Sequence, residues 1–152
     1  MLITYHHPLT PRPSRQAGVG LIEVLIAVLV LSIGMLGMAG LQTWALRNNQ
    51  SASQRSLAVV QAYYIADVMR TDRVNAVNNG FNLAIDADPP SGTSYIAQSL
   101  TNWRANLHDA LGADATGSVD CNGPLCDIVV RWDDSRATDG NTQQEISIRV
   151  EL

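Results

Sequence analysis

The stretch GVGLIEVLIAVLVLSIGML, residues 18–36, decides how the chain is organised. It opens an uncharged run of 23 residues from Val24 to Leu46, and one acid, Glu23, stands directly before that run. As a helix rising about 1.5 Å per residue, the run would reach about 34 Å, enough for a hydrocarbon core of about 30 Å. A carboxylate drawn into the membrane costs about 2.5–3.5 kcal/mol on insertion scales, so Glu23 calls for a functional explanation.

Length and charge limit the classes of function. The chain has 152 residues, one domain's worth, and a net charge of −4. Its ten basic residues are single arginines scattered among acids: Arg12, Arg15, Arg47, Arg55, Arg70, Arg73, Arg104, Arg131, Arg136 and Arg149. Binding to a phosphate backbone requires a basic patch, so direct nucleic-acid binding is not expected.

The segment 1–18 is expected to be a cytoplasmic leader. It carries Arg12 and Arg15 but no acid, which places it on the cytoplasmic side of a membrane. Three prolines interrupt any regular helix there: Pro8, Pro11 and Pro13. A Sec-type signal peptide is the competing interpretation, but the apolar run exceeds a 7–15-residue apolar region and no small-x-small cleavage site follows it. His6 and His7 lie in this removable segment and are assigned no metal.

Gly18, a short gap, Glu23 and an unbroken apolar helix together resemble the signal of type IV prepilins. In that family a prepilin peptidase cuts after the glycine and methylates the new amino terminus, and the helix is kept. The resemblance implies that Gly18 is the last leader residue and that Val19 is the first mature, methylated residue. The sequence departs from the family at Val19, where phenylalanine is usual, and at Gly20, where threonine or serine is frequent.

The resemblance also gives Glu23 a role in assembly, as the partner of a neighbouring subunit's terminal ammonium. A buried ammonium and a buried carboxylate must pair, because either alone is costly. The alternative is an interfacial acid at a helix N-terminus, favoured by the helix dipole and reaching toward lipid headgroups.

Further stretches, 21–27, 31–42 and 66–76, are similar to minor pilins of the type IV pilus. The resemblance implies a structural subunit and no enzyme, with no cofactor and no metal. Its partners would be the prepilin peptidase, other major and minor pilins, the inner membrane and the pilus assembly platform. The chain would start as a single-pass inner-membrane protein with a periplasmic head and end in the fibre. A pseudopilin of a type II secretion system and a bitopic membrane protein with a periplasmic binding domain are the alternatives.

Helical periodicity continues beyond the membrane to about Val77, and Asn78-Asn79-Gly80 is a stop signal. The apolar face expected to meet the head is Leu46, Leu57, Val60, Tyr64 and Val68, with Ile65 and Met69 beside it. Within the span, Gly34, Gly37 and Gly40 allow close helix packing or reflect the general frequency of glycine in membrane helices. The expected organisation is a leader (1–18), a transmembrane and assembly helix (19–46), its periplasmic continuation (47–80) and a globular head (81–152).

The head is expected to be small and α+β, giving a pilin-like fold in which the long helix packs on an antiparallel sheet. Residues 81–94 predict an irregular connection. A helix is expected next, because apolar residues recur at helical spacing, and Gly112 would cap its C-terminus. These residues are Ile96, Leu100, Trp103, Leu107 and Leu111. Trp103 is expected in the core, and His108, in the last turn, is not expected to be catalytic. Alternation predicts strands at 128–132 and 146–152, joined by a polar connection at 133–142 that contains Asp139-Gly140.

Two cysteines, Cys121 and Cys126, stand in the distal half. Their spacing is not a redox C-x-x-C and leaves no second ligand pair for zinc. If this half is exported, a short-loop disulfide is the natural interpretation, and two reduced, partly buried thiols are the alternative.

Overall fold

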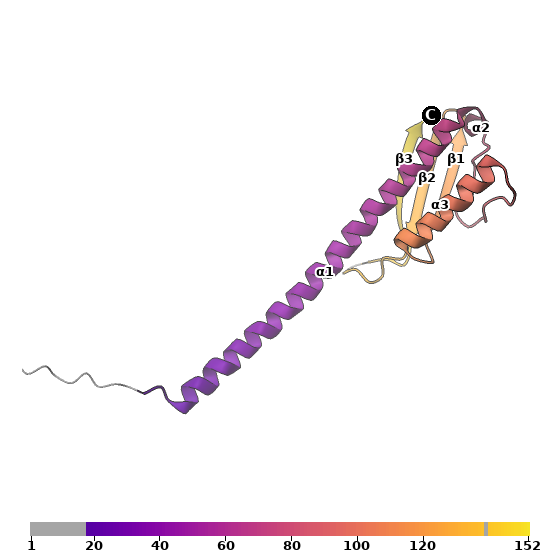
Figure 1. Cartoon of the computed structure of the whole chain (residues 1–152). Coiled ribbons are helices and arrows are strands. Elements are labelled where there is room, and N and C mark those ends of the chain that lie inside the picture. Colours follow the sequence, from indigo (N-terminus) through magenta and orange to yellow (C-terminus); the bar gives the residue numbers. More distant parts are fainter. Residues whose placement is uncertain (1–17, 139) are drawn as a thin grey trace, which may run out of the picture. The chain divides into compact units, whose positions relative to one another are not determined.

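The computed structural model of the chain describes residues 18–138 and 140–152 (Figure 1). The expected leader, apart from Gly18, and Asp139 of the expected hairpin connection lie outside the described residues. Helix α1 runs from Leu21 to Thr71. The chain forms two compact units that divide between Gly40 and Leu41, within this helix, and each unit is described by itself.

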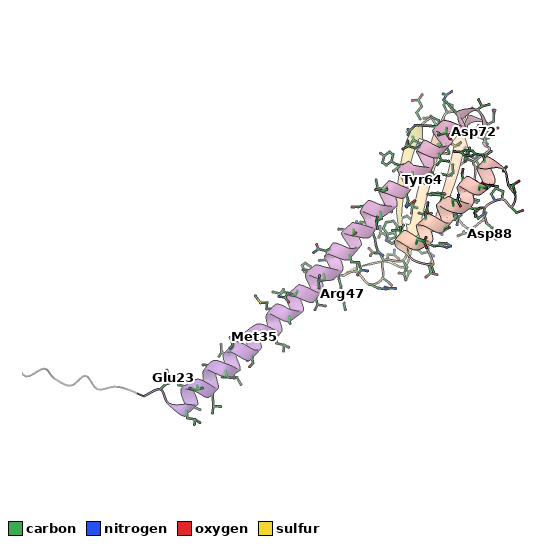
Figure 2. All side chains as sticks on the ribbon, viewed as in Figure 1. Glu23, Met35, Arg47, Tyr64, Asp72 and Asp88 are labelled. Atoms are coloured by element: carbon green, nitrogen blue, oxygen red, sulfur yellow. A yellow bond between two sulfur atoms is a disulfide. The ribbon has the colours of Figure 1, made fainter. Side chains whose placement is uncertain are left out.

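The described part of the first unit is a short extended lead-in and the first twenty residues of α1. All its described side chains are exposed, and Figure 2 shows those of Glu23 and Met35 projecting from the ribbon. Among the described residues, α1 is the one helix with a segment long and apolar enough to cross a membrane. These apolar side chains are not buried within the protein. A surrounding lipid or protein environment would cover them.

The second unit contains the rest of α1, two more helices and one sheet. These elements are α2 (Arg73–Val77), α3 (Tyr95–Leu111), β1 (Thr116–Asn122), β2 (Leu125–Trp132) and β3 (Gln144–Glu151). The sheet is antiparallel throughout, in the order β1-β2-β3. Helices α1 and α3 lie on the same face of this sheet (Figure 1). The α+β fold expected from the sequence, a long N-terminal helix packed on a small antiparallel sheet, is confirmed.

The core lies between that face of the sheet and the two helices. Its largest fully buried side chains are Trp103, Trp132, Phe81, Ile65, Met69, Leu100, Leu107 and Ile128. The expected helix closed by Gly112 is confirmed, because the Gly112 N–H donates to the carbonyl of His108 (3.0 Å) at a φ of 112°. Ser94 caps the other end, where its side chain accepts from the Ala97 N–H (3.2 Å).

The prediction of which face of α1 meets the head was right for Ile65 and Met69 and wrong for most of the stripe beside them. The buried residues of α1 are Ala58, Ala62, Ile65, Ala66 and Met69. Of the expected stripe, Leu46, Val60 and Tyr64 are exposed, at 69%, 60% and 42%. Small alanines let the backbone of α1 come close to the head, where the Gln61 carbonyl accepts from the Trp103 indole, so close packing selects a face that hydrophobicity alone does not.

The prediction of a single helix reaching Val77 was also wrong, because the helix breaks at Asp72. The backbone of Asp72 leaves the helical region (φ −127°, ψ 55°), and its carboxylate accepts both hydrogen bonds from Asn75 Nδ2 (2.9 and 2.8 Å). The carboxylate makes no cap hydrogen bond to the backbone, so at this break Asp72 and Asn75 are joined through their side chains. The stop at Asn78–Gly80 is confirmed: Asn79 takes a φ of 65° and the Gly80 N–H donates to Asn75 O (2.9 Å).

The sheet has one strand more than the expected pair. β1 pairs with β2 through a tight turn, and its other edge is covered by the 82–85 segment. Leu83 and Val119 exchange two backbone hydrogen bonds (2.9 and 3.0 Å), and Asn82 Oδ1 accepts from the Cys121 N–H (2.8 Å). The connection expected to be irregular therefore serves as an edge cover.

Arg104 on α3 holds the rest of that connection in place. Its guanidinium donates to the carbonyls of Ala84, Ile85 and Ala87 and to the hydroxyl of Thr116. Burial lowers the pKa of Arg104, and the nearby carboxylates of Asp88 and Asp86 act in the opposite direction. The arginine remains a cation and stabilises a segment whose carbonyls have no strand partner.

Candidate functional site

The chain enters α1 through three exposed residues with no regular structure, Gly18, Val19 and Gly20. The helix is closed at its start by the Gly20 carbonyl, which accepts from the N–H groups of Glu23 (3.0 Å) and Val24 (3.3 Å). Val19 is 71% exposed, and no other described residue lies close enough to Gly18 for an added Cβ to touch. The Gly18–Val19 peptide bond is therefore accessible, as a peptidase requires.

Glu23 occupies the first turn of α1. A carboxylate is favoured there because the first backbone N–H groups of a helix carry partial positive charge. Among the described residues no hydrogen-bond or ion-pair partner for this carboxylate is found. The acid is placed well by the helix and remains available to a partner.

A shallow hollow at the start of α1 brings two of the expected site residues together. It is lined by Val19, Glu23, Val24, Ala27, Val28 and Leu31. Its surface is apolar except for the single carboxylate. A hollow of this kind can accept an apolar helix that carries one positive group at its end.

The comparison with protein families identifies this segment. Residues 13–39 match the prokaryotic N-terminal methylation motif, which includes Gly18, Val19 and Glu23. No curated protein and no solved structure matches the chain.

The motif and the fold together support a type IV pilin-like protein, a structural subunit of a pilus or of a pseudopilus. The motif implies processing by a prepilin peptidase and assembly with other pilins, and the apolar helix fits a membrane-anchored subunit. A structural subunit, and not an enzyme, is what such a motif implies.

The two cysteines are joined in the head. Cys121 of β1 and Cys126 of β2 form a disulfide, and they are directly paired across the two strands with a Cα–Cα distance of 4.0 Å. Both are buried, at 3% and 0% exposure. The disulfide closes the turn through Gly123, whose φ of 64° suits glycine. It fits the oxidising compartment expected for the head.

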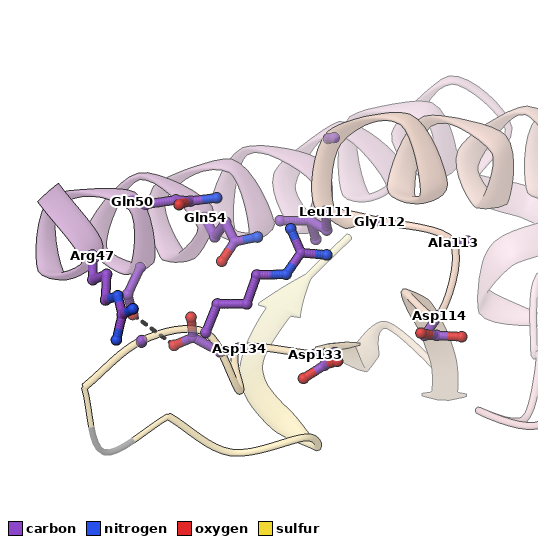
Figure 3. Close-up of a pocket in the computed structure, with 13 residues that line it drawn as sticks. Arg47, Gln50, Gln54, Leu111, Gly112, Ala113, Asp114, Asp133 and Asp134 are labelled. Carbon is purple, nitrogen blue, oxygen red and sulfur yellow. Dashed lines mark hydrogen bonds between the residues drawn. The ribbon is translucent and has the colours of Figure 1, made fainter. Parts of the chain in front are cut away.

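A polar pocket in the head was not foreseen from the sequence. Residues from α1 (Arg47, Gln50, Ser51 and Gln54) face the end of α3 and the β2–β3 loop across it (Figure 3). Ser51 donates to Asp134 Oδ2 (2.6 Å), and Asp134 is 3% exposed. The signal in the sequence was the pair Asp133-Asp134, which follows the buried Trp132 and continues the strand with polar residues.

In this pocket the Ser51–Asp134 hydrogen bond tethers the β2–β3 loop to α1. The Asp134 backbone is fixed as well, because its N–H donates to Asn141 O (2.9 Å) and its carbonyl accepts from Ala137 (2.9 Å). A Cβ at Gly140 would lie on the Asp134 carbonyl, so only glycine fits there. The loop thus holds α1 at Ser51. Among the described residues no group of three His, Cys, Asp or Glu could hold a metal ion, and His108 lies in the last turn of α3.

Proposed function

We propose that the chain is a minor type IV pilin, present sparsely in the fibre or at its tip, that helps to assemble or modify the pilus. The observation that carries the proposal is the exposed Gly18–Val19 bond, followed by Glu23 at the start of an apolar helix within the methylation motif. The finer assignment rests on the stretches 31–42 and 66–76, which are similar to the minor pilin PilV.

The change of charge at the Val19 nitrogen explains how cleavage would lead to assembly. In the precursor the nitrogen of Val19 is a neutral amide, and cleavage after Gly18 turns it into a cation that methylation preserves. The helix N-terminus favours anions and disfavours this cation. A terminal ammonium seated in a neighbour's hollow, against Glu23, would offset that penalty and bury the apolar lining of the hollow. Cleavage would then convert a membrane anchor into an assembly element.

The proposal assigns each segment a place. Residues 1–18 form the cytoplasmic leader, 19–46 the transmembrane and assembly helix, 47–80 its periplasmic continuation and 81–152 the periplasmic head. The disulfide supports a periplasmic head, and the arginines of the leader support a cytoplasmic N-terminus. The assembly platform at the inner membrane would transfer the subunit into the fibre.

Intact-mass analysis of protein from sheared fibres tests the proposal. The expected species begins at Val19 and carries one added methyl group. Gly18→Val should leave the leader attached, whereas Gly20→Ala, two residues away, should be processed as the parent is. Met1 retained in assembled fibres would overturn the proposal. A processed chain that is absent from fibres and required for protein secretion would favour the pseudopilin.

A further inference from the structure

The two edges of the sheet are treated differently. The outer edge of β1 is covered by Leu83, Asn82 and the Arg104-bound segment described above. The outer edge of β3, at the far side of the sheet in Figure 1, has no strand beside it among the described residues. β3 is eight residues long, contains no proline and pairs with β2 without a bulge. Such an edge is a template for another strand.

The backbone groups free on that edge can be identified. The Leu152 N–H donates to Pro124 O (2.9 Å), on the β2 side. Because the N–H and C=O of alternate residues point to opposite edges of a strand, Val150, Ile148 and Ile146 also face β2. Glu145, Ser147 and Arg149 therefore present their backbone N–H and C=O groups to the open edge.

The side chains at those positions are self-complementary. An antiparallel copy of β3 centred on Ser147 places Glu145 opposite Arg149 of the second copy, and Arg149 opposite its Glu145. Centring on Glu145 or on Arg149 instead opposes like charges. Centring on Ile148 opposes Glu145 and Glu151, and centring on Ile146 leaves Glu145 opposite Ser147. Opposite charges directly across a strand pair stabilise it and like charges destabilise it, so one register is favoured.

The existing ion pairs extend that pattern across the sheet. Arg149 binds Asp127 on β2 (2.7 and 2.8 Å), and Glu145 binds Arg131 (2.5 Å). In the register centred on Ser147, each row across the four central strands alternates in sign: Asp127, Arg149, then Glu145 and Arg131 of the second copy. Within these four strands every charge has opposite charges for neighbours, although on β1 the residue opposite Asp127 is another acid, Asp120.

The inner face of β3 is only partly covered. Ile146 and Ile148 pack on the core but stay partly exposed. In this register each of them lies opposite the other in the second copy, at pairs without backbone hydrogen bonds, where side chains approach most closely. On α1, Val59 and Tyr63 are 38% and 50% exposed. Gln61 contacts α3, and each of these two residues is two positions from it. Because two positions turn about 200° around a helix, both lie on the side of α1 away from α3.

We propose that two copies of this chain associate through β3, antiparallel and centred on Ser147, to form a continuous six-stranded sheet with two-fold symmetry. The second copy supplies backbone partners for Glu145, Ser147 and Arg149 and covers Ile146 and Ile148. The two-fold axis reverses direction, so the head segments of α1 run in opposite senses in the pair. If the chain is a fibre subunit, as proposed above, subunits of one fibre share one direction, and the pair joins heads of different fibres.

Charge reversal with complementation tests the pairing on the full chain in detergent, by sedimentation equilibrium over a range of protein concentrations. Glu145→Arg and Arg149→Glu should each weaken the dimer about tenfold or more, because two attractive pairs become repulsive. An equimolar mixture of the two variants should restore association, because one chain then carries arginine at positions 145 and 149 and the other carries glutamate at both. Glu151→Arg, on the same face of the same strand, is the matched control and should dimerise as the parent does.

A second variant separates pairing from folding. The Ser147 N–H faces the open edge, so Ser147→Pro removes no hydrogen bond within the monomer and should abolish the dimer while circular dichroism stays unchanged. A parent that stays monomeric, or a dimer insensitive to Glu145→Arg, Arg149→Glu and Ser147→Pro, would overturn the proposal. Leader processing plays no part in this measurement. A failure of the dimer proposal can therefore be distinguished from a failure of the proposed pilin function.

Discussion

The indole Nε1 of Trp103 donates a 3.0 Å hydrogen bond to the backbone carbonyl of Gln61, and this bond joins α3 to the middle of the head segment of α1. Trp103 is fully buried and its ring lies against Gly117 of β1, where an added Cβ would come within 2.5 Å of the ring. One side chain of α3 therefore contacts both α1 and the sheet.

Two buried tryptophans should respond differently to loss of the indole nitrogen. Trp103→Phe removes the hydrogen bond that the Gln61 carbonyl accepts in addition to its bond within α1, and should lower the free energy of unfolding by about 0.5–1.5 kcal/mol in addition to the cost of the cavity it leaves. Trp132→Phe should cost less, because Trp132 Nε1 is buried without a hydrogen-bond partner among the described residues. Chemical denaturation of both variants checks the order. Equal losses would mean that the Trp103 hydrogen bond contributes nothing.

The tether between Ser51 and Asp134 should be measurable as a coupling. Asp134→Ala should lower the free energy of unfolding by about 1–3 kcal/mol and Ser51→Ala by about 1 kcal/mol, because each leaves a polar partner unsatisfied. The double variant should lose less than the sum, which a double-mutant cycle quantifies. Asp133→Ala serves as the neighbouring control and should show no coupling to Ser51→Ala. Additive losses at Ser51 and Asp134 would contradict the tether.

The disulfide should be present in protein recovered from the periplasm. Alkylation in denaturant without reductant should label neither Cys121 nor Cys126, and after reduction it should label both. The Cys121→Ser/Cys126→Ser variant should lose less than the roughly 3 kcal/mol expected for a 15-residue loop, because this loop is much shorter. Labelling of both cysteines before reduction would show that the thiols are free.

Glu23→Val should improve anchoring and impair assembly at once. The change removes a carboxylate that costs a few kcal/mol in the membrane, so membrane insertion should be retained or stronger. Leader cleavage should persist, because Gly18 is unchanged. The chain should nevertheless be lost from sheared fibres, because the neighbouring ammonium has no partner.

Fractionation into membrane and fibre checks this, with Glu23→Asp as the variant that keeps the charge. Entry of Glu23→Val into fibres at the parent level would favour the alternative of an acid that reaches toward lipid headgroups.

Acid should weaken the β2–β3 pair through Asp127. The hydrogen bond from Arg149 holds the pKa of Asp127 below its ordinary value of 3.8. A lowered pKa in the folded state gives stability that is present above 3.8 and is lost as the pH falls through the folded value. Thermal unfolding between about pH 2 and 6 should show a steeper acid decline for the parent than for Asp127→Asn. Parallel curves would mean that the pair does not contribute.

The sequence was sufficient for the long helix, α3 with its glycine cap, and the two strands with branched residues, because these carry strong periodic signals. β1 was missed because Thr116–Asn122 is poor in β-branched and aromatic residues. The alternation of Gly117, Val119 and Cys121 with polar neighbours, ahead of Asn122-Gly123, was the available signal. Large side chains dominated the expected face of α1, whereas the buried face, which comes close to Trp103, contains three alanines.

The part of the candidate site that a sequence can indicate is the part that is local in sequence. Gly18, Val19 and Glu23 fall within six consecutive residues, and the family match covers all three. The Ser51–Asp134 tether joins residues 83 positions apart and depends on a loop conformation that admits only glycine at residue 140. No periodicity encodes a contact of that kind.

The alanine face of α1 divides mutational tolerance along one helix. Ala58, Ala62 and Ala66 are fully buried, so larger side chains there would overpack the core, typically at a cost of about 1–3 kcal/mol, and should be selected against for reasons of folding. On another face of the same helix, Leu57, Val60 and Tyr64 are exposed, and the fold places little demand on them. In related chains, the residue types at these three positions would depend on the molecule that lies beside the helix. Substitutions along this one helix are therefore under two separate constraints: packing against its own head on one face, and contact with its surroundings on the other.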